Sequence, residues 1–200
     1  MSEGTSPKRR YRMVARAEAA AETRERMLAT AWRLFADRPY EEVRLGDVAA
    51  EAGVTVQTLH ARFGPKDALF VAAWRWKMAP VGAQRDAAPV GDVRAAVRVL
   101  YDSYEADGDA ALRLLAQEHR IPAVREMTDG GRAWHRAWVE RTFAPLLDGL
   151  RGAERERRLV ATVVATDLLV WKLLRREMGL GRAAAEQIVT EMVTAPKGSP

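Results

Sequence analysis

The stretch DVAAEAGVTVQTLHARFGPKDALF, residues 47–70, constrains the fold most, because glycines interrupt its helical pattern twice. Gly53 suits the left-handed backbone conformation that ends a helix and turns the chain sharply. Thr55 is placed to cap a new helix, which runs only about two turns before Gly64 and Pro65 end it. The stretch therefore predicts two short helices joined by a tight turn.

The helix expected at residues 55–63 has an apolar and a polar face. Val56 and Leu59 point back at the preceding helices, so the two short helices are expected to pack at a steep angle as a helix-turn-helix. The other face has a size and polarity that suit the major groove of DNA. It holds Gln57, Thr58, Ala61 and, toward its end, His60.

Helical spacing continues along the chain, and no run alternates between apolar and polar residues for long enough to predict a strand. The expected fold class is therefore all-α. A fourth helix starts at Pro65, and an earlier helix, which ends before Pro39, carries an apolar stripe at Leu28, Ala31, Trp32 and Phe35.

In the second half of the chain, glycine and proline mark the expected helix ends. Residues 79–92 predict a loop or weak linker, and Gly130 with Gly131 predicts a kink or a break. Helices are expected at about residues 92–106, 109–119, 122–149, 154–178 and 182–194.

Positive charge is concentrated at the beginning of the chain. Residues 1–80 carry 14 Lys and Arg against 10 Asp and Glu, whereas residues 81–200 carry 18 against 17. A basic arm at residues 1–20, next to a small folded module, suggests a polyanionic partner. A solubilising tail is the alternative interpretation of this arm.

The sequence excludes several classes of function. Cysteine is absent, which excludes disulfides, thiolate metal sites and cysteine nucleophiles. The three histidines lack metal-ligand spacing, and no nucleophile elbow or phosphate-binding glycine loop occurs, so we expect no enzyme, cofactor or metal. No apolar run reaches the roughly 20 residues of a membrane span, and no signal core is present, so a soluble, cytoplasmic protein is expected.

Residues 23–74 resemble the DNA-binding domain of the TetR family of transcriptional regulators. The resemblance rests on LFADRPYEEV in the first helix, DVAAEAGV around the turn, and TLHARFGPKDALF, which joins the recognition helix to the fourth helix. It implies a three-helix, helix-turn-helix domain at residues 21–78. A helical effector-binding and dimerisation domain would follow at residues 79–194, and a tail at residues 195–200.

The resemblance assigns DNA contacts to individual residues. Val56, Gln57 and Thr58 lie where the family meets base edges, and the Gln57 amide suits a bidentate contact to adenine. Thr55 and Thr58 are placed to donate to phosphates, and Lys66 stands at the family's usual phosphate contact. The alternatives are that Thr55 is only a helix cap and that Lys66 is a solvated charge.

Three positions depart from the family's usual pattern. His60 replaces a tyrosine that commonly touches the DNA backbone, and its imidazole can still donate to phosphate. Arg44 replaces the Thr or Ser that caps the second helix; a guanidinium cannot cap a helix start but can reach a phosphate. Pro65 replaces a frequent Ser. In the arm, the residues placed to enter the minor groove or to follow phosphates are Arg9, Arg10 and Arg12.

From Leu159 onward, the helix expected at residues 154–178 is apolar almost all round, so it is expected to be buried on more than one side. In the TetR family the last two long helices pair with those of a second copy in a four-helix bundle, which implies an isologous homodimer. Asp167, the one charge between Leu159 and Trp171, is placed to pair with Arg175, Arg176 or a partner residue, or is an ordinary buried carboxylate. A monomeric core helix is the alternative. The interface residues expected are Val160, Val164, Asp167, Leu168, Trp171, Ile188 and Met192.

The same resemblance implies an effector pocket in the second domain. Aromatic side chains at helical spacing offer walls for an apolar or planar ligand, although such residues are also typical of a core. A regulator without a ligand is a further alternative. The candidates for the pocket are Tyr101, Tyr104, His119, Met127, Trp134 and Trp138, with His135 and Phe143 nearby.

The expected function is that of a homodimeric repressor, which a small-molecule effector of unknown identity releases from a pseudo-palindromic operator. The partners expected are double-stranded DNA, a second copy of the chain and the effector, and no membrane. A transcriptional activator of the same fold and a helical protein-binding adaptor are the alternatives.

Overall fold

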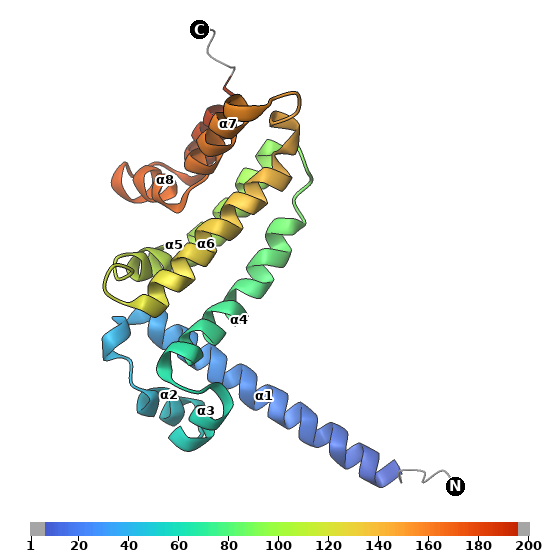
Figure 1. Ribbon diagram of the computed structural model, residues 1–200. Coiled ribbons are helices and arrows are strands. Elements are labelled where there is room, and N and C mark those ends of the chain that lie inside the picture. The colour runs from blue at the N-terminus through green and yellow to red at the C-terminus, as the bar shows by residue number, and fades with distance from the viewer. Residues whose placement is uncertain (1–6, 196–200) are drawn as a thin grey trace. The chain divides into compact units, whose positions relative to one another are not determined.

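The computed structural model describes residues 7–195, and every regular element in that range is helical (Figure 1). The all-α fold class is therefore confirmed. The chain divides into two compact units, Met1–Lys77 and Met78–Pro200. The division falls within α4 (Lys66–Asp86), so this helix contributes residues to both units.

The first unit begins with a long helix. It contains α1 (Pro7–Asp37), the 3-10 turn η1 (Tyr40–Glu42), α2 (Leu45–Ala52), α3 (Val56–Phe63) and the first part of α4. The basic segment that we expected as an arm at residues 1–20 is, from Pro7 onward, part of α1. The reason is local: good helix formers fill residues 15–22, and neither glycine nor proline interrupts the chain between Pro7 and Pro39.

The apolar stripe expected on the first helix lies in the core of the first unit. Leu28, Ala31 and Phe35 are buried. The Phe35 ring stacks on Tyr40 of η1, with centroids 5.4 Å apart, and meets Phe70 of α4 edge to face at 5.0 Å. These aromatic contacts hold α1, η1 and the first part of α4 together, while α2 packs against both α1 and α3.

The turn between α2 and α3 has the expected geometry. Gly53 follows α2 directly and adopts φ 66° and ψ 38°, the left-handed conformation. Its N–H donates to the carbonyl of Ala50 at 3.2 Å, and the N–H of Val54 reaches back to Ala49 at 3.0 Å. The predicted helix-turn-helix is therefore confirmed.

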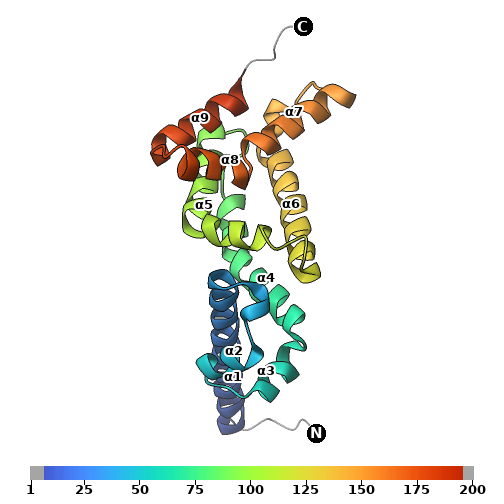
Figure 2. The same ribbon diagram turned by 90° about the vertical axis from the view of Figure 1, so that its left-hand side faces the viewer.

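The second unit is built around α5. Its elements are the rest of α4, α5 (Val93–Leu115), α6 (Pro122–Thr142), the 3-10 turn η2 (Ala144–Leu146), α7 (Gly152–Ala165), α8 (Leu168–Lys172), the π-helical turn η3 (Leu173–Glu177) and α9 (Arg182–Thr194). α5 packs against α6, α8 and α9, as Figures 1 and 2 show. Buried side chains such as Leu100, Trp138 and Val189 form the common core of these helices.

Several glycines do not end helices as we expected. Residues 79–86, expected in a loop, continue α4. α5 runs through Gly108, and α6 runs through Gly130 and Gly131 and ends at Thr142. A glycine inside a helix costs only about 1 kcal/mol relative to alanine, so the packing of a long helix outweighs it.

Gly108 has a specific packing role. A Cβ added there would lie 2.5 Å from two ring carbons of Trp171 in α8. The Trp171 ring is 1% exposed, and its Nε1 donates to the Glu105 carboxylate of α5 at 3.0 Å. Glycine therefore allows the indole of α8 to approach the backbone of α5.

The helix expected at residues 154–178 is divided into α7, α8 and η3. The break lies at Thr166 and Asp167, between α7 and α8. The Asp167 carboxylate accepts a hydrogen bond from the Leu169 N–H at 2.8 Å and so caps α8. A charged residue in an apolar run therefore starts a new helix here.

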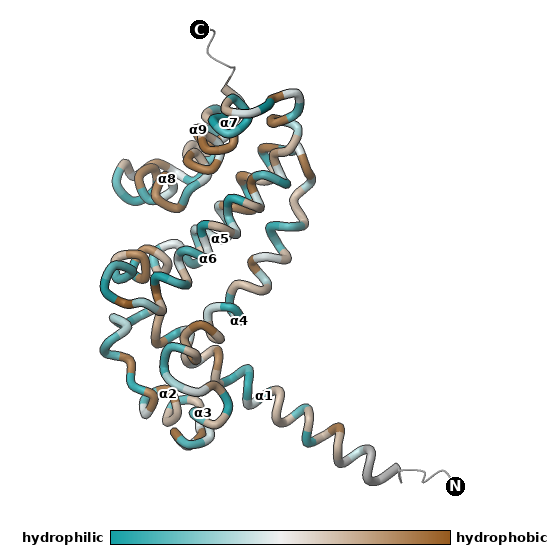
Figure 3. The backbone as a smooth tube through the Cα atoms, viewed as in Figure 1, coloured by the Kyte–Doolittle hydropathy of each residue, from teal (hydrophilic) through white to brown (hydrophobic). Residues whose placement is uncertain are grey.

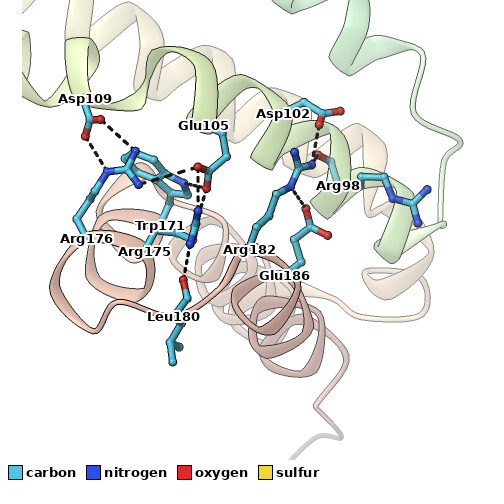
Figure 4. Close-up of polar contacts among 10 residues, drawn as sticks. All are labelled: Arg98, Asp102, Glu105, Asp109, Trp171, Arg175, Arg176, Leu180, Arg182 and Glu186. Atoms are coloured by element: carbon cyan, nitrogen blue, oxygen red, sulfur yellow. Dashed lines mark hydrogen bonds and ion pairs between the residues drawn. The ribbon is translucent and has the colours of Figure 1, made fainter.

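Ion pairs join α5 to the segment after α8 (Figure 4). Arg175 Nε lies 2.5 Å from Glu105 Oε1, and Arg176 Nη2 lies 3.0 Å from Asp109 Oδ2. Hydrogen bonds from these arginines lower the pKa of the Glu105 carboxyl and that of the Asp109 carboxyl. Because both arginines pair with α5, the pairing with Asp167 that we considered is not formed within the protomer.

Candidate nucleic-acid interface

α3 is anchored by its middle and exposes most of its other side chains. Leu59 is 1% exposed, whereas Val56, expected to point inward, is 46% exposed. The difference arises because Val56 is the first residue of a helix that has only eight residues, so the middle of the helix meets its neighbours and its start does not. The exposed surface of α3 consists of Val56, Gln57, Thr58, His60, Ala61 and Arg62.

Thr55 caps α3, as expected. Its Oγ1 accepts from the Thr58 N–H at 3.0 Å, and the two hydroxyl oxygens lie 2.8 Å apart. Both side chains are exposed. The start of α3 therefore offers hydroxyl groups at the positive end of a helix dipole, an arrangement that favours phosphate.

A groove of about 720 Å³ lies between the exposed face of α3 and α1. The side chains that line the groove are mostly small, so they leave its volume open. Arg62 and Thr23 line it, although the sequence did not single them out, because their proximity depends on how α1 and α3 cross. The lining residues are Ala19, Ala20, Thr23 and Met27 of α1, and Gln57, Thr58, Ala61 and Arg62 of α3.

Lys66 is engaged within the first unit. Its ammonium donates to the carbonyls of Tyr40 and Glu41 and lies 4.3 Å from the centroid of the Tyr40 ring. Burial lowers the pKa of this ammonium. The interpretation of Lys66 as a simple solvated charge is therefore wrong, because the residue is half-buried and ties η1 to α4.

The remaining predicted DNA contacts lie at the surface or outside the described side chains. His60 is exposed on α3, and Arg44 is exposed just before α2, where its side chain forms no capping hydrogen bond. The backbone of Arg9, Arg10 and Arg12 belongs to α1, but their side chains lie outside the described part of the structure.

The residues considered for an effector pocket differ in burial. Tyr101, Met127 and Trp138 are buried, His119 is exposed, and Tyr104 and Trp134 are half-buried. The last two rings flank a residue that the sequence did not single out. It is Arg85, whose Cζ lies 5.2 Å from the Tyr104 centroid and 5.0 Å from the Trp134 centroid. It was missed because its segment was expected to be a loop.

The residues considered for a dimer interface also differ in burial. Val160 and Val164 of α7 and Met192 of α9 are exposed and therefore available to a second copy. Trp171 is buried against α5 of its own protomer, so its assignment to the interface is wrong. Leu168 and Ile188 are partly buried against the protomer core, and Asp167 is the cap of α8.

Two further exposed apolar side chains extend this surface. Leu169 and Leu173 lie one turn apart on α8 and η3 and are 58% and 46% exposed. The apolar character of this segment is visible as the brown colour of α8 in Figure 3. The sequence did not separate them from buried neighbours, because an almost wholly apolar helix does not reveal which side its own protomer covers.

The fold and the exposed face of α3 define a DNA-binding regulator of the helix-turn-helix class. The sequence model described as "Bacterial regulatory proteins, tetR family" matches residues 27–73, which span most of α1, all of α2 and α3, and the beginning of α4. Residues 27–73 therefore form a DNA-binding domain of the TetR type. No curated protein matches it.

Solved structures of transcriptional regulators share the fold over most of both chains. One from Rhodococcus sp. Rha1 has a TM-score of 0.64 and 20% identity and covers 84% of this chain and 92% of its own. Another from Saccharomonospora viridis, in complex with choline, has a TM-score of 0.62 and 21% identity over 86% and 96%. A TetR-like regulator from Rhodococcus sp. RHA1 has a TM-score of 0.55 and 18% identity over 86% and 93%.

The described range, residues 7–195, contains no group of three or more His, Cys, Asp or Glu side chains that could hold a metal ion. It also contains no helix with the length and apolarity needed to span a membrane.

Proposed function

We propose that the protein is a homodimeric repressor that reads an operator with α3 and leaves it when a small molecule binds the second unit. The observation that carries this proposal is the exposed, capped face of α3. Gln57 and Thr58 project from a helix that a single buried residue, Leu59, anchors. A helix held in this way is free to enter a major groove.

The contacts divide into base reading and phosphate binding. Val56, Gln57 and Thr58 meet base edges, with the Gln57 amide bonded to adenine through its two polar atoms. Phosphates are bound by hydroxyl, imidazole and cationic groups around the two short helices, and these contacts fix the register of the protein on DNA. The phosphate-binding residues around these helices are Arg44, Thr55, Thr58, His60 and Lys66. At the beginning of the chain, Arg9, Arg10 and Arg12 enter the minor groove or follow phosphates.

The homodimer is supported by exposed apolar side chains on the second unit. Val160 and Val164 lie one turn apart on α7, and Leu169 and Leu173 lie one turn apart on α8 and η3. Met192 of α9 adds to the set. Apolar side chains gathered on neighbouring elements are typical of an interface. A symmetric dimer presents two copies of α3 to two half-sites of one duplex.

Effector control is supported by the continuity of α4. This helix carries Lys66 at its start, in the first unit, and Arg85 in its last turn, in the second. The regulator from Saccharomonospora viridis in complex with choline supports the binding of small molecules by this fold. A ligand that binds one conformation of the second unit more tightly shifts the population of the DNA-binding form.

The experiment compares Gln57→Ala with Gln84→Ala on DNA. Duplexes that bind the wild-type protein are first selected from random sequence. Gln57→Ala is expected to lower the affinity for the selected site about tenfold or more and to relax the preference at one base pair. Gln84 is exposed on the part of α4 in the second unit, so its replacement is expected to change neither quantity. Equal binding by both variants would contradict the assigned role of Gln57.

A further inference from the structure

Arg85 is a buried cation in the second unit. Its side chain is 4% exposed, and three aromatic rings surround it. Its Cζ lies 5.2 Å from the ring centroid of Tyr104, 5.0 Å from that of Trp134 and 5.6 Å from that of Trp138. Such contacts stabilise a guanidinium, but by less than the penalty for removing its charge from water.

No carboxylate among the described residues forms an ion pair with Arg85. Its Nη2 and Nε donate to the Ser103 hydroxyl at 2.7 and 3.3 Å, and that hydroxyl in turn donates to the carbonyl of Leu100. The Tyr104 hydroxyl is a further hydrogen-bond partner of the guanidinium. A guanidinium has five N–H groups, so part of its hydrogen-bonding capacity is still not used by these bonds. Buried charges in proteins are normally paired, and an arginine fits a carboxylate through two parallel hydrogen bonds.

His135 provides a second unsatisfied polar group beside the same ring. Its ring stacks on Trp138 with centroids 5.9 Å apart, and its Nδ1 is buried without a hydrogen-bond partner. The hydroxyl of Thr166 donates to the carbonyl of Thr162 at 2.8 Å. The proton between His135 Nε2 and Thr166 Oγ1, which lie 3.1 Å apart, therefore belongs to Nε2. Nδ1 is left as a bare acceptor, which calls for a hydrogen-bond donor.

We propose that Arg85 anchors the effector, and that the effector is a small organic carboxylate that carries an O–H or N–H donor for His135. This inference rests on the proposed function and names the chemical class of its ligand. The carboxylate supplies the missing counter-charge of Arg85, beside the rings of Tyr104 and Trp134. Trp134 is half-buried, so the cluster reaches the surface on its side.

The position of Arg85 gives the ligand a route to control. Trp138 of α6 donates from Nε1 to the Arg85 carbonyl at 3.1 Å, and the Tyr104 hydroxyl of α5 donates to the Thr166 carbonyl at the end of α7, at 3.0 Å. The cluster therefore joins the last turn of α4 to α5, α6 and α7. A carboxylate bound there acts directly on α4, the helix that the two units share.

The first test is calorimetry with four probes: salicylate, benzoate, benzamide and choline. Salicylate offers a carboxylate and a donor, benzoate only the carboxylate, benzamide the same ring without charge, and choline the opposite charge. We expect the order salicylate, benzoate, then no measurable heat for the last two. Arg85→Met is expected to weaken salicylate binding about 30-fold or more, and Arg98→Met, which removes an exposed arginine of α5, is expected to leave it unchanged. Failure of both carboxylates to bind at millimolar concentration, or equal binding of benzamide or choline, overturns the proposal.

The second test needs no ligand. If Arg85 is an unpaired cation kept for a ligand, Arg85→Met removes a buried charge and fills its place with an apolar chain. The variant is then expected to melt at least about 2 °C above the wild-type protein. If Arg85 is instead a structural residue, Arg85→Met lowers the melting temperature, and that result also overturns the proposal.

Band-shift assays with the duplexes selected by the wild-type protein separate this inference from the proposed function. Retained DNA binding by Arg85→Met, together with lost salicylate binding, supports both. If the wild-type protein binds DNA but binds no carboxylate, the proposed function stands and the carboxylate site at Arg85 is contradicted. Absence of DNA binding in the wild-type protein contradicts the proposed function itself.

Discussion

At the scale of single residues, two side chains of the second unit have roles that their neighbours define. Gly108 is required by the packing of the Trp171 ring, because a Cβ at that position would lie 2.5 Å from two ring carbons. His135 is buried as a neutral imidazole between Thr166 and Trp138. Neither role is visible in the local sequence, since each depends on a residue from another helix.

Gly108→Ala is expected to destabilise the protein by about 1–3 kcal/mol, because the rigid indole has to move away from α5. Helix propensity alone would favour alanine by about 1 kcal/mol. The control is Gly131→Ala in α6, where an added Cβ meets nothing within 4 Å, and this variant is expected to be slightly more stable. Chemical denaturation of both variants measures the difference. A Gly108→Ala variant as stable as Gly131→Ala would show that Trp171 is not closely packed on α5.

His135 makes stability depend on pH. Burial, together with the nearby charge of Arg85, lowers the pKa of His135 to about 4. Because the folded-state pKa lies below the unfolded value of about 6.5, the unfolded chain binds the extra proton first as pH falls. Stability is therefore expected to decrease from pH 6.5 toward pH 4, by about 3 kcal/mol from this group.

The measurement is the free energy of unfolding against pH for the wild type, His135→Gln and His119→Gln. His135→Gln keeps an N–H donor for Thr166 but does not titrate, so its profile is expected to be flatter over this window. His119 is exposed, and its replacement is expected to leave the slope unchanged. An unchanged slope in His135→Gln would mean that this histidine is not held neutral in the fold.

At the scale of elements, local signals predicted the helix-turn-helix well. Gly53 and Thr55 act through their own backbone conformation and their nearest N–H groups, so the sequence contains what is needed to place them. The boundaries of the second unit were harder to predict. Asp167 starts α8 inside an apolar run, because its side chain caps the new helix. Gly108 lies within α5, because the packing of that helix outweighs the tendency of glycine to end it.

The start of α3 offers an element-scale prediction that separates two roles of Thr55. Thr55→Ala removes the cap and is expected to cost about 1 kcal/mol of stability. Thr55→Asp keeps a capping oxygen and is expected to stay within about 0.5 kcal/mol of the wild type. The added negative charge next to a phosphate would, however, weaken DNA binding strongly. Denaturation and anisotropy measurements test both, and unchanged DNA affinity in Thr55→Asp would leave Thr55 with a capping role alone.

At the scale of the whole molecule, the exposed apolar side chains of α7, α8 and η3 predict a dimer. Val164 is 55% exposed on α7, and Val164→Glu would place a charge in the interface. It is expected to shift the protein from dimer to monomer in sedimentation velocity at micromolar concentration. Val90, 64% exposed outside these helices, provides the matched control, and Val90→Glu is expected to remain dimeric. Identical sedimentation of the two variants would place the interface elsewhere.

How much of the site could be predicted also differs between the two units. The DNA-reading face of α3 follows from an eight-residue helix whose pattern is complete in the sequence. The Arg85 cluster does not, because its members come from α4, α5, α6 and α7 and meet only when those helices pack. Burial of a cation is a property of the assembled unit rather than of a motif.

The proposed function requires that α3 binds operator DNA. The most direct measurement is a band-shift titration of the wild-type protein with the DNA upstream of its own gene, repeated over a range of salt concentrations. We expect a discrete retarded band at low salt, which persists to higher salt than the band formed with unrelated DNA of equal length. The affinity is expected to fall steeply as the salt concentration rises, because phosphate contacts release counterions. Absence of any retarded band at low salt would contradict it.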